Sequence, residues 1–289
     1  MKKFIYRISI FIILLVLMNF FLSIKIDELY YNKYEEVDLN FETYLLSDSH
    51  GDALGNLTEK INVYNFSAGG DSYIDMNRKL HFLIKNSKIQ RVLVSVDDHT
   101  LSKYREVMNN VDRSSVFLDW KIGDSKEKLF KLIKNNYVKK YLTFFNIKGR
   151  EVLKAYLNSK LRGKNNHYRK WNSLSLTEKI KLSNTRFNFQ FNHEKSELLT
   201  SSLFEIINLS KENNIELIGV KFPLSNEYCN AIGDNSFEAD HVFESKKINV
   251  IDNKKIFSEN QDFFNDQDHL NKKGSIAFIE ILSNIILIK

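Results

Sequence analysis

The chain has 289 residues, 43% of them hydrophobic, a formal net charge of +6 and a single cysteine, Cys229. This size allows one sizeable globular domain with an insertion and excludes two typical domains plus an anchor. One cysteine excludes an internal disulfide, and because no His or acid motif accompanies Cys229, we expect no catalytic thiol there.

Residues 1–25 are predicted to form a membrane anchor. Three basic residues within the first seven precede an uncharged run from Ile8 to Ile24. The run approaches the roughly 17–25 residues that span a bilayer, and the basic residues ahead of it would stay in the cytoplasm. Small residues suited to signal-peptide cleavage are missing at 21–27. We therefore expect an uncleaved single-pass anchor in the cell membrane, with the rest of the chain periplasmic or at the cell surface.

After a polar stalk at 26–40, apolar runs and amphipathic segments alternate through 41–289. The predicted strands are 43–46, 61–66, 92–96, 215–220 and 248–251. The main predicted helices between and after them are 73–88, 197–213 and 276–288. Strands separated by helices predict an α/β domain with a parallel five-stranded sheet and right-handed crossovers.

The stretch from about 101 to 192 interrupts this alternation and is predicted to be an inserted helical cap, with helix-like segments at 126–145 and 151–161. Residues 121–170 contain fifteen Lys or Arg and three acids. A cap bordering the site would favour anionic substrates or surfaces, such as acidic polysaccharide or anionic lipid headgroups. The alternative is a set of solvated amphipathic helices, because charge runs are usually solvated faces.

A candidate catalytic pair lies near the C-terminus, in the sequence DQDHLNKKGS at 266–275. Asp266, three residues ahead of His269, can hold the Nδ1–H of that imidazole and leave Nε2 free as a base. The matching nucleophile is predicted to be Ser49, which follows the apolar strand 43–46 at a turn of small polar residues.

Four blocks, at 47–50, 63–72, 91–99 and 266–274, resemble in order the motifs of the SGNH (GDSL-like) hydrolase family, of the membrane-anchored esterase or O-acyltransferase type. The resemblance implies a flavodoxin-like three-layer α/β/α fold. It also implies a Ser49, His269 and Asp266 triad that forms and breaks acyl esters. An oxyanion hole would come from the amides of Ser49 and Gly70.

The third block departs from the family pattern, because Asp97, Asp98 and His99 stand where the family has an Asn. An ionised carboxylate cannot donate a hydrogen bond, so we expect His99 to be the third oxyanion donor. A hole without a side-chain donor would cost roughly 10²-fold or more in rate. Asp48 and Asp98 are further residues expected at the site.

These features predict an extracytoplasmic esterase or O-acyltransferase that acts on acyl esters of cell-surface carbohydrate. Its expected partners are the membrane, the acyl-ester or carbohydrate substrate and an acyl-exporting membrane protein. We expect no cofactor, no metal and no nucleic-acid partner.

Two alternatives remain open at this point. Residues 47–52, with 70–71 and 98–99, also resemble the metal-binding blocks of calcineurin-like metallophosphoesterases, although the expected final His-x-His is missing. A catalytically inactive glycan-binding protein with the SGNH fold is the other alternative.

Overall fold

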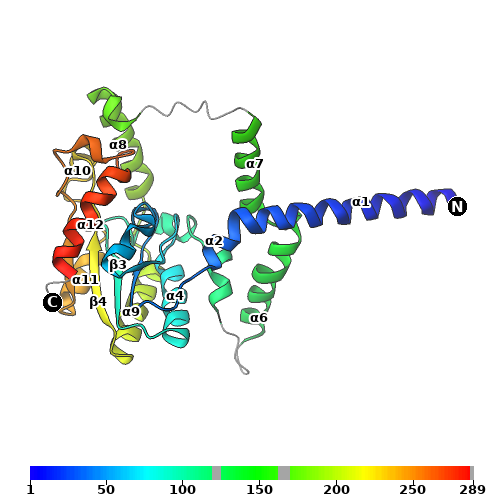
Figure 1. Cartoon of the computed structure of the whole chain (residues 1–289), viewed down its shortest axis with the longest axis horizontal. Helices are drawn as coiled ribbons and strands as arrows, with labels where there is room; N and C mark the ends of the chain where they lie inside the picture. Colours follow the sequence, from blue (N-terminus) through cyan, green and yellow to red (C-terminus); the bar gives the residue numbers. More distant parts are fainter. Residues whose placement is uncertain (119–124, 162–169, 287–289) are drawn as a thin grey trace. The chain divides into compact units, whose positions relative to one another are not determined.

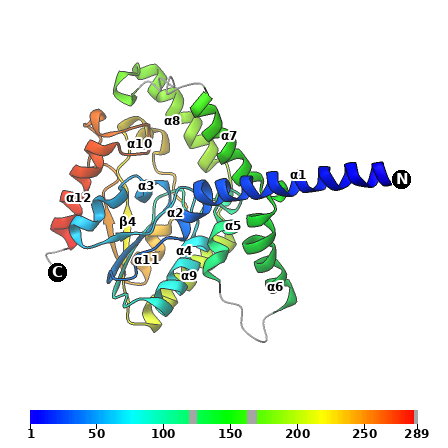
Figure 2. The ribbon, with the colours of Figure 1, turned by 45° about the vertical axis from the view of Figure 1, so that its right-hand side comes forward.

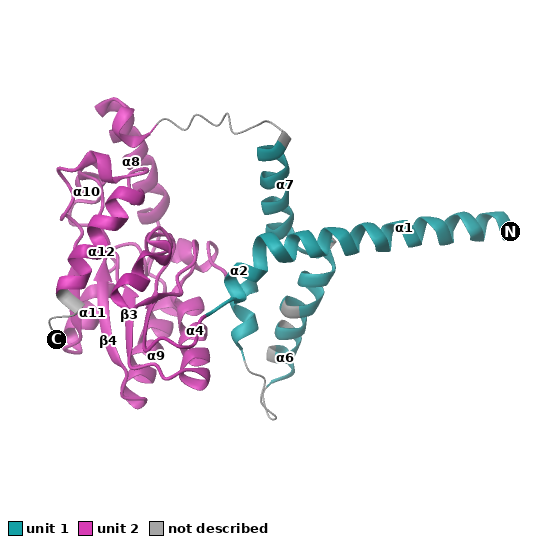
Figure 3. Ribbon diagram, viewed as in Figure 1, with its two compact units in different colours: residues 1–37, 111–167 teal, residues 38–110, 168–289 magenta. Residues whose placement is uncertain are grey.

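The computed structural model describes residues 1–118, 125–161 and 170–286. The chain divides into two compact units (Figure 3). Unit 1 comprises Met1–Val37 and Val111–His167, and unit 2 comprises Asp38–Asn110 and Tyr168–Lys289. This division differs from the predicted boundaries at 25 and 40. It also differs in the insertion, because unit 1 groups residues 111–167 of the predicted cap with the N-terminal helix, whereas 101–110 and 168–192 belong to unit 2.

Unit 2 is built on a five-stranded sheet in which every neighbouring pair is parallel, in the order β2-β1-β3-β4-β5. Its strands are β1 (Thr43–Leu46), β2 (Tyr64–Asn65), β3 (Arg91–Ser95), β4 (Glu216–Lys221) and β5 (Asn249–Asp252). The predicted parallel α/β sheet is therefore confirmed. The strand order reverses direction between β1 and β3, the position at which open α/β sheets bind ligands beyond the carboxyl ends of the strands.

The α-helices of unit 2 are α3 (Ser49–Asp52), α4 (Tyr73–Asn86), α8 (Leu176–Phe191), α9 (Glu197–Glu212), α10 (Asn226–Ile232), α11 (Ala239–Ser245) and α12 (Lys272–Ile286). Three of them, α4, α9 and α12, overlap the predicted helices. The predicted strand at 61–66 is shorter in the structure because a 3₁₀ helix (Gly55–Ile61) takes its first residue, and Asn62 then adopts a left-handed backbone with φ of 56°.

Successive side chains along each strand point to opposite faces of the sheet. Leu45, Leu93 and Ile218 occupy paired positions on neighbouring strands and bury one face against Phe278 and Leu282 of α12. Helices α4 and α9 pack against each other on the other side of the strands, as Figures 1 and 2 show. Both faces of the sheet are thus covered, which is why its strands are almost continuously apolar.

Unit 1 is helical: α1 (Lys2–Ile26), a π-helical turn (Asp27–Tyr31), α2 (Asn32–Glu35), α5 (Val111–Ser114), α6 (Lys126–Ile133), a second π-helical stretch (Lys134–Lys139) and α7 (Ile147–Leu161). The helical stretch Lys2–Glu35 is long and apolar enough to cross a membrane, with a mean hydropathy of 2.4 in its apolar window. The segment expected to be a polar stalk continues this helix as far as Glu35.

Candidate active site

Ser49 is the first residue of α3, immediately beyond the end of β1. Asp48 caps this helix, because its Oδ1 accepts a hydrogen bond from the backbone N–H of His50 at 3.0 Å. Gly51 is needed for the tight strand-to-helix turn: a Cβ at that position would lie 2.6 Å from the Ser47 Cβ. The turn leaves Ser49 partly exposed while Asp48 and His50 are buried.

Ser49, His269 and Asp266 meet as a hydrogen-bonded chain. The Oγ of Ser49 lies 2.8 Å from Nε2 of His269, although 220 residues separate them in sequence. On the other side of the ring, Nδ1 lies 2.9 Å from Oδ1 of Asp266, which also accepts the backbone N–H of His269 at 2.9 Å. The carboxylate therefore fixes both the ring and the turn that carries it, and Nε2 faces the hydroxyl.

A second carboxylate reaches the same imidazole. Oδ1 of Asp268 lies 3.2 Å from Nδ1 of His269, and the Asp268 side chain is fully buried. Burial alone would lower the pKa of His269, but the hydrogen bonds with Asp266 and Asp268 outweigh it and raise this pKa to about 9. The sequence signal for Asp268 was present, since it lies between the two predicted catalytic residues.

Beneath the triad lies a buried layer of ionisable side chains. Nδ1 of His50 is 2.9 Å from Oδ2 of Asp97, and its Nε2 is 3.6 Å from Oδ2 of Asp268. Nε2 of His99 lies 3.2 Å from Oδ2 of Asp48. Asp48 and His99 are among the residues expected at the site from the sequence, whereas His50 has an expected role only in the metallophosphoesterase alternative.

Two arginines complete the charge balance of this layer. Arg105 lies 3.3 Å from Oδ2 of Asp48, and Nε of Arg186 lies 2.7 Å from Oδ2 of Asp268. Burial opposes ionisation of Asp48 and Asp268, but their cationic neighbours overcome it and hold both carboxyl pKa values well below the usual range. For His50 the carboxylates likewise overcome burial and raise its pKa well above the usual range. The buried carboxylates of Asp48, Asp97 and Asp268 thus face three cationic side chains, those of His50, Arg105 and Arg186.

The loop that would supply the second oxyanion donor is held by Asn110. Nδ2 of Asn110 donates to the carbonyl of Gly69 at 3.0 Å and to Oδ1 of Asp71 at 2.7 Å. Gly70, between them, has φ of +92°, and a Cβ there would lie 3.4 Å from Nδ2 of Asn110. A glycine suits this position on both counts. No sequence signal singled out Asn110, which belongs to none of the four blocks.

Arg105 connects the two loops of the site. Its guanidinium pairs with Asp48, next to the nucleophile, and donates to the backbone carbonyl of Asp71, next to Gly70. In the described part of the chain, the amides of Ser49 and Gly70 donate to no other protein group. Both N–H groups therefore remain available to an oxyanion.

Two residues expected at the site are engaged elsewhere. His99 is buried, and its Nε2 is occupied by Asp48, so this atom is unavailable as the expected oxyanion donor. Asp98 lies in a different ion cluster, 2.6 Å from Lys221 and 2.5 Å from Lys254. Burial raises the pKa of Asp98, but these lysines lower it by more, so the group stays ionised and neutralised.

The blocks that a metallophosphoesterase would use do not converge among the described residues. The carboxylate of Asp71 binds Lys79 at 2.6 Å, while Asp98 belongs to the lysine cluster. Two smaller groups have donor atoms close enough to surround a cation: His50 with Asp268 and His269, and Asp48 with His50 and Asp97. Both contain the His50 imidazole, whose raised pKa means that it competes for these carboxylates as a cation.

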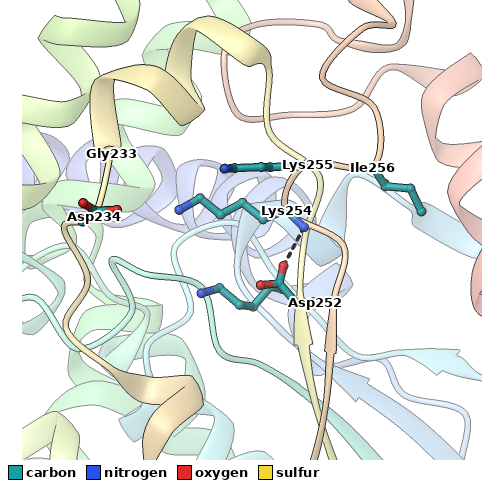
Figure 4. A pocket seen from close by; sticks show the side chains of 7 residues that line it. Gly233, Asp234, Asp252, Lys254, Lys255 and Ile256 are labelled. Atoms are coloured by element: carbon teal, nitrogen blue, oxygen red, sulfur yellow. Dashed lines mark hydrogen bonds between the residues drawn. The ribbon is translucent and has the colours of Figure 1, made fainter.

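A separate pocket of about 720 Å³ lies where β4 and β5 end, lined by Lys221, Gly233, Asp234, Asp252, Lys254, Lys255 and Ile256 (Figure 4). The backbone N–H of Lys254 donates to Oδ1 of Asp252 at 2.9 Å and closes the turn after β5. None of the triad residues lines this pocket. Two of its lysines, Lys221 and Lys254, form ion pairs with Asp98, and Lys221 also pairs with Asp240.

No protein-family model matches the chain, and no curated protein matches it. Among solved structures, it is similar to a GDSL-like lipase from Bacteroides thetaiotaomicron, with 8% identity, a TM-score of 0.42 and coverage of 88% of this chain and 93% of that one. It is also similar to the psychrotrophic esterase EstA from a Pseudoalteromonas species, with 12% identity, a TM-score of 0.41 and coverage of 86% and 98%.

Proposed function

We propose that this chain is a membrane-anchored serine esterase or O-acyltransferase that acts on acyl esters of cell-surface carbohydrate. The observation that carries the proposal is the 2.8 Å contact between Ser49 Oγ and His269 Nε2, with Asp266 on the opposite ring nitrogen. A nucleophile, a base and an orienting carboxylate in this order are the machinery of acyl transfer.

In the proposed reaction, His269 Nε2 takes the proton of Ser49 as Oγ bonds to the ester carbonyl carbon. The amides of Ser49 and Gly70 stabilise the resulting oxyanion. As the intermediate collapses, the leaving alcohol takes the proton from His269 and an acyl-Ser49 ester remains. Water or a sugar hydroxyl then attacks this ester, passes its proton to His269, and Ser49 recovers it on release.

The extracytoplasmic location rests on the anchor, and the carbohydrate substrate rests on that location together with the resemblance to SGNH hydrolases. The apolar helix α1 supports a location at the membrane, and three basic residues before it favour a cytoplasmic N-terminus. An acyl-exporting membrane protein is the proposed source of acyl groups for the transferase form of the reaction.

Labelling of the full-length protein with a fluorophosphonate probe tests the proposal. We expect covalent labelling that chelators do not affect, that Ser49→Ala abolishes and that Ser201→Ala, an exposed serine of α9, leaves intact. Absence of labelling and turnover in the folded protein would contradict the proposal and favour a glycan-binding role. Metal-dependent phosphatase activity that survives Ser49→Ala would favour the metallophosphoesterase alternative.

A further inference from the structure

Unit 1 carries helices that run across the apolar helix α1. In Figure 3, α6 and α7 extend to either side of the C-terminal part of α1. At the crossing with α7, a Cβ on Gly149 would lie 2.6 Å from Cγ2 of Ile26, and Leu153 packs in one cluster with Ile26 and Tyr31. If α1 follows the membrane normal, α6 and α7 lie along the membrane surface.

Hydrogen bonds to α1 fix the position, along the axis of α1, of the segment that connects α6 to α7. Nδ2 of Asn19 donates to the carbonyl of Tyr141 at 2.8 Å, and its Oδ1 accepts from the backbone N–H and the hydroxyl of Thr143 at 3.0 and 2.9 Å. Asn19 precedes Lys25, the first charged residue after the apolar run, by six residues or about 9 Å of helix. The segment therefore lies level with the last turns of the apolar run. These bonds also satisfy the polar side chain of Asn19 there.

The surface of this segment is apolar and aromatic. We call it the interface segment, residues 137–147, and its exposed side chains include Tyr137 at 58%, Tyr141 at 56%, Phe145 at 62% and Ile147 at 64%. So many exposed aromatic and aliphatic groups together are unfavourable in water. Tyrosines with aliphatic neighbours are typical of the level of lipid headgroups.

Basic residues flank the interface segment on both sides, in α7 and in α6 with the π-helical stretch that follows it. Among the side chains that the structure describes between 125 and 161, the exposed basic residues are Lys126, Lys134, Arg150, Lys154 and Lys160, and the exposed acids are Glu127 and Glu151. An apolar face bordered by Lys and Arg is typical of helices that lie in the plane of an anionic membrane. Each such cation near the surface favours binding by roughly fivefold.

We propose that the interface segment and its flanking cations dock unit 1 onto the outer headgroup layer of an anionic bilayer. This inference rests on the membrane anchor of the proposed function and adds a second membrane contact to it. The hydrogen bonds that hold the segment beside the apolar helix α1 at Asn19, together with the excess of positive charge, identify lipid rather than a second protein as the occupant.

Depth-dependent quenching in purified nanodiscs tests this proposal. In a Cys229→Ser background, single cysteines replace Phe145 in the interface segment, Leu14 in α1 and Leu198 as a matched control in unit 2, where it is 53% exposed. Each carries an environment-sensitive fluorophore, in full-length protein in phosphatidylglycerol-containing nanodiscs. We expect lipids spin-labelled near the headgroup to quench the label at 145 severalfold more than the label at 198.

Equal quenching at 145 and 198, with a lipid-buried label at 14, would overturn the docking proposal and leave the anchor intact. The same result is expected if a protein partner covers the segment, because no partner is present in the nanodiscs. A label at 14 that stays in water would overturn both, whereas fluorophosphonate labelling of Ser49 tests the catalytic proposal separately.

Charge reversal provides a second test of the docking proposal. We expect the Lys134→Glu, Lys154→Glu, Lys160→Glu variant to reduce quenching at 145 in phosphatidylglycerol nanodiscs. The matched reversal of exposed lysines in unit 2, Lys88→Glu, Lys211→Glu, Lys246→Glu, should leave it unchanged. Equal effects of the two variants would contradict the role of the flanking cations.

Discussion

Nδ1 of His50 lies 2.9 Å from Oδ2 of Asp97, and both side chains are almost fully buried. His50 directly follows the nucleophile Ser49 in α3. The raised pKa of His50 means that the imidazole is a cation in the folded protein. Its charge, with those of Arg105 and Arg186, offsets the charges of the surrounding carboxylates.

Replacing His50 should therefore destabilise unit 2. We expect His50→Ala to lower the free energy of unfolding by about 3–5 kcal/mol, because it leaves buried carboxylates without their compensating charge. Urea unfolding at neutral pH measures this change. His241→Ala, at an exposed position of α11, is the control and should change stability by less than about 0.5 kcal/mol. A loss at position 50 no larger than that of the control would contradict the proposed charge balance.

The pH dependence of the chemistry should follow His269. Only the neutral imidazole can accept the proton of Ser49, and the carboxylates of Asp266 and Asp268 raise the pKa of His269 to about 9. We expect the rate of fluorophosphonate labelling to rise about tenfold per pH unit below this value and to level off above it. A rate that is already constant at neutral pH would show that the His269 pKa is not raised in this way.

Asp268, the second carboxylate beside His269, should partly compensate for the loss of Asp266. Because Asp268 Oδ1 lies 3.2 Å from Nδ1, it can still orient the ring in Asp266→Asn. We expect this variant to lose roughly 10–10² in labelling rate, against the roughly 10⁴ seen when a lone orienting aspartate is replaced. The comparison variant is Asp266→Asn, Asp268→Asn, which should lose considerably more. If the single variant already loses the larger amount, Asp268 does not support the ring.

The regular parts of this structure could be predicted because they depend on periodicity. Buried parallel strands give continuous apolar runs, and α4 and α9 show the helical period, so four of the strands and these two helices were predicted to within two residues. Helix α12 begins four residues before its predicted start, and its predicted end at 288 lies outside the described residues. The strand at β2 was overestimated, since a 3₁₀ turn and a left-handed Asn62 interrupt an apolar run without changing its composition.

The site was predictable only where residues lie in short motifs. Ser49, Asp266 and His269 stand in compact blocks, and the structure brings them together. Arg105 and Asn110 lie in segments without a recognisable motif. Their contacts with Asp48, Gly69 and Asp71 form only in the folded chain and could not be predicted from the sequence. The contact of His99 was unpredictable for a related reason, because its sequence position does not reveal that Asp48 occupies its Nε2.

Stability should also respond to His269. Its folded pKa, about 9, exceeds the ordinary value of 6.5, so the stabilisation is fully present below about pH 6.5 and is lost as pH rises through 9. A shift of this size corresponds to at most about 3 kcal/mol. Urea unfolding at pH 6 and at pH 10 should show this loss in the native chain and a smaller one in His269→Asn. Equal losses in both proteins would assign the effect to other groups.

The last prediction concerns the loop of the oxyanion donors. Asn110 holds the carbonyl of Gly69 and the carboxylate of Asp71, so it fixes where the N–H of Gly70 points. In Asn110→Ala we expect the maximal labelling rate to fall about tenfold, less than the roughly 10²-fold or more that follows loss of a direct donor. Probe affinity should change little, because Asn110 acts through the loop. Asn109→Ala, one residue earlier, is the matched control. An unchanged maximal rate, or a loss confined to probe affinity, would show that Asn110 holds the loop without serving the chemistry.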